Sequence, residues 1–311
     1  MAKQATREAY GKALVALGAE NPDIVVLDAD LSKSTKTADF AKHYPERFFN
    51  MGIAEANMMG TAAGLAAAGK IPFASTFAVF ATGRAFEQIR NSIAYPKLNV
   101  KIAATHSGVT VGEDGGSHQA IEDVAIMRAL PNMTVLVPAD GEETRQVIYA
   151  AAQYKGPVYI RMGRLDVPLL FDENYTFEIG KANVIREGSD VVIFANGVMV
   201  AAALEAAEEL AGRGVQAAVV NVASVKPLDQ ETIVRMAKAT GAVVTAEEHT
   251  IIGGLGSAVA EVLAENAPTP MVRVGLKDCF GESGRPFELL AKYGLTQKEI
   301  LEAVDEVLKR K

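Results

Sequence analysis

One glutamate stands alone in a long run of apolar and small residues near the start of the chain. The run over residues 48–69 contains Glu55 and no other charged side chain. On a helix that starts near Ile53, this glutamate shares a face with Met59, Ala62 and Ala66. Such a helix is apolar nearly all round, which predicts that it lies inside the protein. A buried carboxylate is costly unless it is paired, hydrogen-bonded or neutral, so Glu55 is a candidate for chemistry; a structural acid is the plainer alternative.

A second group of chemically useful side chains lies in one loop. Residues 104–119 hold two histidines, two acids and four glycines, among them His106, Asp114 and His118. A predicted strand precedes the loop and a predicted helix follows it, which places the loop where open α/β folds bind ligands. Glycine lets the backbone approach a ligand, while His and Asp supply donors and acceptors for hydroxyl or phosphate groups. Taken singly, Asp114 holding a turn is a competing interpretation.

Aromatic and basic residues beside other predicted elements extend this set. Phe77 and Phe80 lie one helical turn apart after a short predicted strand. They are suited to stack on a planar ring, although aromatics at that spacing usually belong to a core. Arg161 and Arg164 follow another predicted strand, and Arg7 opens the first predicted helix. An arginine just past a strand end suits an anion, although most arginines are simply solvated.

Alternating β-branched runs and alanine-rich stretches predict the elements that position these residues. In the first half we expect strands at 24–27, 72–74, 100–103, 134–137 and 158–160. Helices are expected between them at roughly 5–18, 53–68, 79–94, 119–129 and 141–153. This alternation predicts an α/β fold, with a mainly parallel sheet covered by helices on both faces.

The same alternation resumes in the second half and predicts a second, smaller α/β domain. The intervening stretch 172–188 is rich in Asp, Asn and Gly, with one weak strand-like segment, and predicts a linker. The first domain therefore covers residues 1–171 and the second covers 189–311. Further strands are expected at 191–194, 216–222, 242–245 and 271–274, and helices at 199–211, 229–239, 255–265 and 296–309.

Composition excludes several classes of function. The 311 residues carry a net charge of −7 with no basic block, which argues against binding nucleic acid or anionic membranes. Glycines, asparagines and Glu55 interrupt the run 48–69, so it does not predict a membrane span. The single Cys279 and the absence of an apolar leader fit a cytoplasmic protein. Four histidines and one cysteine without ligand spacing predict no protein-held transition metal.

A series of short motifs follows one another along the whole chain in the order found in a known family. They are Thr6-Arg7, Ala29–Ser34, Gly52–Glu55, Ser75–Phe80, Ala104–His106, Gly112–Gln119, Leu130–Asn132, Pro138–Gly141 and Arg161. Through them the chain resembles the C-terminal half of transketolase, which consists of a pyrimidine-binding domain and a C-terminal domain. The resemblance implies a transferase of the kind that acts in the pentose phosphate pathway. It would use thiamine diphosphate to move a two-carbon ketol unit from a ketose phosphate to an aldose phosphate.

The resemblance also implies which residues meet the cofactor. Glu55 is similar to the glutamate that bonds N1′ of the thiamine diphosphate aminopyrimidine. Its charge there favours the imino tautomer, whose nitrogen accepts the C2 proton. Phe77 and Phe80 resemble the walls around the aminopyrimidine, with Phe80 in the stacking position. Asp30 is similar to an acidic residue near the cofactor.

Other residues are implied to hold the sugar. The phosphate-binding positions match Arg7, Ser34, His106 and Arg161. Asp114 resembles the residue that reads a substrate hydroxyl, and His118 resembles one that contacts the reacting end of the sugar. Glu55, His106 and His118 are therefore the catalytic candidates of this chain.

The chain departs from the family pattern in three places. Ala54 and Ala56 flank Glu55 where Arg and His are usual, which is nearer to deoxyxylulose phosphate synthase, and Gly83 replaces a pocket tyrosine. No Gly-Asp-Gly motif with downstream asparagines is present. The resemblance therefore implies a partner chain that supplies this motif and holds the diphosphate and Mg²⁺, in an α2β2 assembly. Gly253–Gly256 is too short a motif to predict a nucleotide site.

Two other functions remain open at the level of sequence. One is acyl transfer from pyruvate, as in deoxyxylulose phosphate synthase or the beta subunits of 2-oxoacid dehydrogenases; the altered neighbours of Glu55 favour it. The other, of a different class, is a scaffold subunit that has kept the fold without the chemistry. The presence of Glu55, His106, Asp114 and His118 argues against the scaffold.

Overall fold

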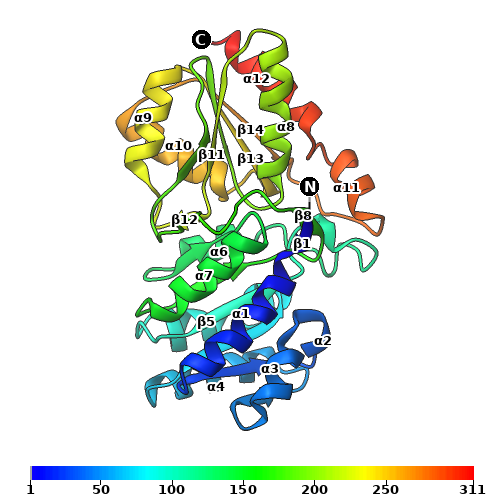
Figure 1. The fold of residues 1–311 in the computed structure, drawn as a ribbon, viewed down its shortest axis with the longest axis vertical. Coiled ribbons are helices and arrows are strands. Elements are labelled where there is room, and N and C mark those ends of the chain that lie inside the picture. The colour runs from blue at the N-terminus through cyan, green and yellow to red at the C-terminus, as the bar shows by residue number, and fades with distance from the viewer. Residues whose placement is uncertain (1) are drawn as a thin grey trace.

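Two sheets form the framework of the computed structural model, which describes residues 2–311 (Figure 1). The strands of the first half are β1 (Lys3–Ala5), β2 (Ile24–Asp28), β3 (Phe48–Asn50), β4 (Ile71–Phe77), β5 (Lys101–Thr105), β6 (Thr134–Leu136), β7 (Val158–Arg161) and β8 (Asp166–Pro168). Its helices are α1 (Thr6–Glu20), α2 (Ser32–Thr35), α3 (Thr37–His43), α4 (Glu55–Ala67), α5 (Phe86–Gln88), α6 (Asp123–Ala129) and α7 (Gly141–Gln153). Short 3₁₀ turns occupy η1 (Pro45–Arg47) and η4 (Val109–Val111), and π-helical segments occupy η2 (Phe80–Arg84) and η3 (Ile89–Ala94).

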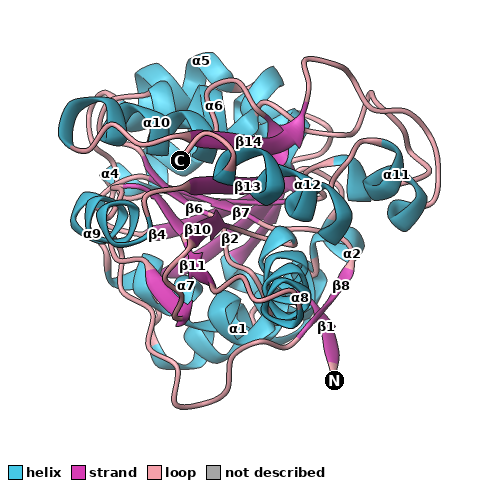
Figure 2. Ribbon diagram, turned by 90° about the horizontal axis from the view of Figure 1, so that it is seen from above, coloured by secondary structure: helices cyan, strands magenta, loops and turns pink. Residues whose placement is uncertain are grey.

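The second half repeats the alternation of strands and helices. Its strands are β9 (Asn183–Arg186), β10 (Val191–Ala195), β11 (Ala217–Asn221), β12 (Ser224–Lys226), β13 (Val243–Thr250) and β14 (Met271–Leu276). Its helices are α8 (Met199–Gly212), α9 (Gln230–Thr240), α10 (Leu255–Asn266), α11 (Pro286–Lys292) and α12 (Gln297–Leu308). Seen from above, helices lie on both sides of the strands (Figure 2).

The first sheet has the strand order β12-β6-β7-β5-β4-β2-β3 and is parallel except for β12. Alternate side chains of β2 enter two different cores, because successive residues of a strand face opposite sides of the sheet. Val25 and Leu27 pack in the same cluster as α4, whereas Ile24 and Val26 pack in the same cluster as α1. The strand β12 belongs to the second half of the chain, so the two halves share this sheet.

The second sheet has the order β14-β13-β10-β11-β9 and is parallel except for β9. It too is covered on both faces, by one cluster that includes α8 and α12 and another that includes α9 and α10. The predicted fold class, two mainly parallel sheets with helices on both faces, is confirmed. The antiparallel strand β9 falls inside the stretch 172–188 that the sequence predicted as a linker, because its four residues are only partly buried and lack a strong apolar pattern.

Three helical predictions change in the structure. The single helix expected over 79–94 is instead η2, the short α5 and η3, a π-rich path that periodicity analysis at 3.6 residues cannot detect. Helix α6 starts at Asp123 rather than near 119, because residues 107–120 form a closed loop held by backbone pairing of Ser107 and Ala120. Helix α4 is not fully buried: Asn57, Gly60 and Gly64 are exposed in this chain.

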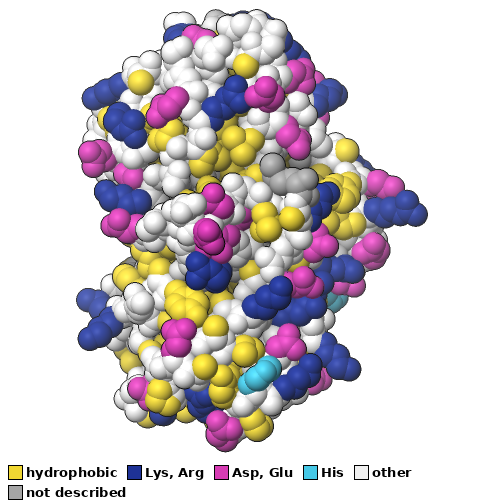
Figure 3. Space-filling view, in the orientation of Figure 1, with side chains coloured by type: hydrophobic (Ala, Val, Ile, Leu, Met, Phe, Trp, Pro, Cys, Tyr) yellow, Lys and Arg dark blue, Asp and Glu magenta, His cyan; other side chains and the backbone are white. Residues whose placement is uncertain are grey.

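Charges are interspersed on the face drawn in Figure 3, where Lys and Arg alternate with Asp and Glu. Among the helices of residues 2–311, none has the length and apolar content needed to cross a bilayer.

Buried acids attach the connection between the halves to helix α7. Asp140 caps α7 by accepting from the Glu143 amide, and its second oxygen accepts from the amides of Leu170 and Phe171. Glu143 is fully buried and accepts from the Tyr175 hydroxyl at 2.5 Å and the Asn221 amide at 2.6 Å. The second acid therefore joins α7 to the connecting segment and to β11.

The protonation of Glu143 should make stability depend on pH. Burial raises its pKa to about 7 despite three hydrogen bonds that favour the carboxylate, against 4.5 for the unfolded chain. The native state therefore binds more protons between these values, and the free energy of unfolding should fall as pH rises through them. Glu143→Gln should flatten that slope in urea unfolding series run from about pH 5 to pH 8. An unchanged slope in the variant would assign the effect to other groups.

Candidate functional site

The candidate residues gather at the carboxyl edge of the first sheet. Asp30 and Ser34 follow β2, Phe77 ends β4, His106 follows β5, and Arg164 follows β7. Since β2, β4, β5 and β7 are parallel neighbours, their carboxyl ends meet at one edge. The loop after β3 brings Glu55 to the same edge, as the first residue of α4.

Four ring side chains form the centre of this site. His106 stacks on Phe77 with ring centroids 3.8 Å apart, and Phe77 stacks on Phe80 at 5.9 Å. His118 meets both phenylalanines edge-on, at 5.3 Å from Phe80 and 6.3 Å from Phe77. The structure therefore brings together the two aromatic residues and the two histidines that the sequence singled out. Parallel and edge-on aromatic faces of this kind make a surface on which a flat ring can lie.

The imidazole of His106 is held neutral. Burial is the main cause that lowers its pKa to about 3, and the charges of Arg7, Arg164 and His118 add to the effect. The residue is 3% exposed, and its Nδ1 lies 2.9 Å from the Thr105 hydroxyl. A neutral ring flanked by two guanidinium groups can act as a hydrogen-bond partner for an anion without carrying charge itself.

Arg7 and Arg164 supply the positive charge of the site. Burial and the neighbouring charge of Arg164 lower the pKa of Arg7, and its Nη1 donates to the Ser34 carbonyl at 3.0 Å. The Nε of Arg7 is buried and has no partner among residues 2–311. Two cations that repel each other beside an unused donor are suited to share one anion, such as a phosphate group.

A buried acid that the sequence reading did not single out shapes the loop of Ser34. Asp28 is inaccessible and accepts from the Leu31 amide and from the hydroxyls of Thr35 and Thr37, at 2.6 to 2.9 Å. These bonds hold α2 against the end of β2. The only sequence signal was an acid at the end of an apolar strand, which does not distinguish a structural role from a catalytic one.

Glu55 is buried and paired, as its isolation in the sequence predicted. Its side chain is 1% exposed, and Oε1 accepts from Arg84 Nη1 at 2.8 Å. Its other oxygen, Oε2, is buried and has no partner among the described residues. A carboxylate oxygen left without a donor in a dry place is costly, which is the pattern expected where a ligand completes the hydrogen bonding.

The glycines of the 104–119 loop serve packing between the domains. A side-chain carbon at Gly115 would lie 2.5 Å from the Ser283 hydroxyl, and one at Gly116 would lie 2.7 Å from the Gly281 carbonyl. The segment before α11 therefore presses on this loop. Gln119 fastens the contact, because its buried amide donates to the Glu282 carbonyl at 2.9 Å. These glycines allow one backbone to approach another, and the ligand approach that the sequence predicted is not required to explain them.

Arg161 is not free to hold a phosphate, and this corrects the prediction from the sequence. It is 5% exposed, and its Nε donates to Asp123 Oδ2 at 2.8 Å. Its Nη2 donates to the carbonyls of Ala120 and Glu248, at 3.2 and 2.9 Å. Burial opposes the charge of Arg161, but Asp123 and Glu248 outweigh it and raise the pKa of the guanidinium. Arg164, three residues later, is 37% exposed, so it is the more accessible of the two arginines to a ligand.

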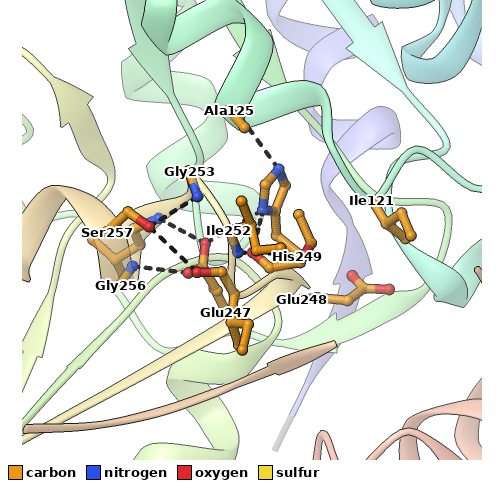
Figure 4. A network of polar contacts seen from close by, with 12 residues as sticks. Ile121, Ala125, Glu247, Glu248, His249, Ile252, Gly253, Gly256 and Ser257 are labelled. Carbon is orange, nitrogen blue, oxygen red and sulfur yellow. Dashed lines mark hydrogen bonds and ion pairs between the residues drawn. The ribbon is translucent and has the colours of Figure 1, made fainter. Parts of the chain in front are cut away.

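The ion pair of Arg161 belongs to a polar joint between the two domains, and Figure 4 shows the β13 side of that joint, with Glu247, Glu248 and His249. On β13, Glu247 accepts from the amides of Leu255 and Gly256, and His249 Nε2 accepts from the Ala125 amide of α6 at 3.3 Å. Glu248 accepts from the Thr110 amide at 2.7 Å, and burial raises its pKa to about 6. The joint therefore connects β13 of the second domain to the loop of residues 104–119, here called the substrate loop, and to α6 of the first domain.

Two further predicted residues lie at the margin of the site. Asp30 is exposed, with a φ of 64°, and accepts from the Asn50 side-chain amide at 3.0 Å. Asp114 is exposed in the loop that the second domain covers. Residues 2–311 contain no cluster of three or more His, Cys, Asp or Glu side chains able to hold a metal ion.

Comparison with known proteins agrees with this geometry. Residues 2–168 match the pyrimidine-binding domain of transketolase, and residues 180–300 match the transketolase C-terminal domain. The chain belongs to the transketolase family. It is 54% identical over 307 residues to a putative transketolase C-terminal section from Methanocaldococcus jannaschii, covering 98% of this chain and 96% of that protein. The resemblance predicted from the motifs is confirmed.

Two further relatives show how this part of transketolase occurs alone. A solved structure described as a split gene transketolase, an inactive beta4 tetramer, is 63% identical, with a TM-score of 0.92 and 99% of both chains covered. The 6-deoxy-6-sulfo-D-fructose transketolase subunit SqwH of a Clostridium species is 49% identical over 305 residues, with 98% of this chain and 95% of that subunit covered. The chain is thus the C-terminal section of a split transketolase, a subunit of a transferase.

The residues at the sheet edge fit one half of the cofactor that the family implies. Glu55 Oε2 is an unused buried acceptor, suited to a ring N–H, and Phe77 and Phe80 offer aromatic faces. A diphosphate and its cation need several oxygen ligands. Residues 2–311 contain no cluster of acids able to hold a metal ion, so the fit described here concerns the aminopyrimidine alone.

The buried pair at the joint should contribute strongly to stability. Arg161→Met leaves Asp123 charged and buried, so the free energy of unfolding of the isolated chain should fall by about 3–5 kcal/mol. Arg164→Met is the matched control: Arg164 is more exposed, its ion pair is with the exposed Glu113 and its Nη1 also donates to the Val111 carbonyl, so the change leaves no buried charge and predicts a smaller loss, about 1 kcal/mol. Urea unfolding of both variants measures the difference. Equal small losses would contradict the joint's role.

Proposed function

We propose that this chain, with a partner chain, transfers a two-carbon ketol unit from a ketose phosphate to an aldose phosphate. The single observation that carries the proposal is the pairing, at one sheet edge, of a buried carboxylate with a cationic pocket. Glu55 leaves one oxygen for an aminopyrimidine, and the charges of Arg7 and Arg164 act on the neutral His106, a combination that suits a sugar phosphate. Thiamine diphosphate, when bound, supplies the nucleophilic carbon and the electron sink for ketol transfer.

Each residue has a defined task in this proposal. Glu55 accepts a hydrogen bond from N1′ of the aminopyrimidine and keeps negative charge beside it. Phe77 and Phe80 exclude water from that ring. His118, half-buried against both phenylalanines, contacts the reacting end of the sugar. Asp114 reads a substrate hydroxyl from the loop, and Asp30 stays near the cofactor without contacting the reaction.

A phosphate or similar anion at the far end of the sugar meets the cationic pocket. The pocket combines Arg7 and Arg164 with the neutral His106 and the loop of Ser34. Guanidinium groups bond tetrahedral oxyanions through paired N–H donors. The SqwH relative is named for a sulfo-sugar, whose sulfonate would use the same donors, so both anions belong in the assay. Pyruvate carries a planar carboxylate and no tetrahedral oxyanion, so the pocket does not favour it as a donor and the acyl-transfer alternative ranks second.

The partner chain has a separate task. It would supply the ligands for the diphosphate and Mg²⁺, and two copies of each chain would form an α2β2 assembly in the cytoplasm. The exposed small-residue face of α4, together with the exposed Ile53 beside Glu55, suits a protein surface that another chain covers. The inactive beta4 tetramer formed by a similar protein agrees with a chain that needs a partner for activity.

Reconstitution tests this proposal, with Glu55 as its sharpest probe. The purified chain alone should show no ketol transfer, and addition of the partner chain, thiamine diphosphate and Mg²⁺ should restore it. In that complex Glu55→Gln should slow hydrogen–deuterium exchange at cofactor C2 by about 10²–10⁴, because a proton-relay group is lost. NMR of quenched samples measures the exchange. Full activity of the single chain, or normal exchange in the variant, would overturn the assignment.

The phosphate pocket is tested by comparing two neighbouring arginines. Arg164→Lys should raise KM for phosphorylated acceptors about tenfold or more, since a hydrogen bond between charged groups contributes about 1.5–3 kcal/mol. Glycolaldehyde, which has no phosphate, should be affected much less. Arg161→Lys should change both acceptors equally, because that side chain is buried away from substrate. The assay includes a ketose phosphate, a sulfo-sugar and pyruvate as donors; faster turnover of pyruvate would favour acyl transfer instead.

A further inference from the structure

The proposed reaction uses Glu55 but leaves its one partner without a task. Arg84 Nη1 donates to Glu55 Oε1 at 2.8 Å, and no other side chain in residues 2–311 pairs with this carboxylate. The two partners differ sharply in environment, since Arg84 is 50% exposed while Glu55 is 1% exposed. An ion pair with one buried member differs from a surface pair, because loss of the cation would leave a charge in a dry site.

Arg84 also touches the aromatic wall of the site. Its guanidinium carbon lies 4.5 Å from the centroid of the Phe80 ring. A guanidinium is flat and permanently charged, so it can stack on an aromatic face while its N–H groups bond a carboxylate in the same plane. One side chain thus holds Glu55 and Phe80 in a single arrangement. Lysine has a compact ammonium and cannot make both contacts in this way.

The backbone explains how Arg84 reaches this place. Phe80 and Arg84 are the first and last residues of the π-helical segment η2, a rare geometry that is frequent at functional sites. Residues four apart are neighbours on a helix surface, so these two side chains lie next to each other. Gly83, between them, faces open space, so no packing constraint requires a glycine there.

We propose that Arg84 is a positioning residue for the cofactor's aminopyrimidine and acts through Glu55. It fixes Oε1, so that the partnerless Oε2 is the oxygen that meets the ring nitrogen. This inference rests on the proposed function, because it needs the aminopyrimidine at Glu55. It extends that function by assigning a separate task to each carboxylate oxygen.

A double-mutant cycle in the reconstituted complex tests this role. The variants are Arg84→Gln, Arg84→Lys, Glu55→Gln and the double Arg84→Gln/Glu55→Gln. Arg84→Gln should weaken thiamine diphosphate binding, measured by calorimetry, and slow C2 exchange about tenfold or more, the effect of losing one charge-assisted hydrogen bond. Arg84→Lys should recover part of the exchange rate. The double variant should exchange at the rate of Glu55→Gln alone, because Arg84 acts through that carboxylate.

A matched control separates this role from a general loss of surface charge. Arg90 is exposed on the neighbouring segment η3 and bonds only the adjacent Asn91, so Arg90→Gln should change neither measurement. The positioning role would be overturned if Arg84→Gln left cofactor binding and C2 exchange unchanged, or if it tightened cofactor binding. It would also be overturned if the double variant exchanged more slowly than Glu55→Gln, by the product of the two single losses. In those cases rapid exchange in the wild-type complex would still support the proposed function. A wild-type complex without cofactor binding would instead overturn both.

Discussion

A buried ion pair at the domain joint determines the shape of the substrate side of this protein. Arg161 is inaccessible enough that its charge must be compensated, and Asp123 compensates it directly. The remaining guanidinium N–H groups reach the Ala120 and Glu248 carbonyls, so one side chain connects β7, the end of the substrate loop and β13. The Glu248 carboxylate then holds the Thr110 amide. The second domain is thereby part of the site's support, although it supplies none of the proposed catalytic side chains.

The same joint explains why the loop between β5 and α6 is rich in glycine. The segment before α11 lies against Gly115 and Gly116 so closely that side chains there would overlap it. A loop held on one side by Glu248 and on the other by this segment can keep His118 beside the phenylalanines. Binding sites on loops gain precision when the scaffold fixes the loop in this way.

On the cofactor side of the protein, the ion pair that matters is the one between Glu55 and Arg84. Glu55 is a carboxylate in a dry place with one cationic partner and one unused oxygen. This arrangement is incomplete in the single chain, in keeping with a transketolase divided between two polypeptides. The exposed face of α4 supports the same conclusion, because small and apolar residues at its surface would be covered in an assembly.

The local sequence pattern was sufficient to predict the fold class and the burial of Glu55. It also predicted that most of the candidate residues lie at one edge of the sheet. Strand–helix alternation dictates a parallel sheet, and a parallel sheet dictates that successive strand ends share one edge. The sequence could not distinguish Arg161, the last residue of β7, from Arg164, which follows it, since only packing decides which guanidinium is buried against Asp123. It also missed Arg84, because the sequence does not show that this side chain reaches the Glu55 carboxylate of another helix, 29 residues away. Contacts between distant segments set these positions, so only the tertiary structure could decide them.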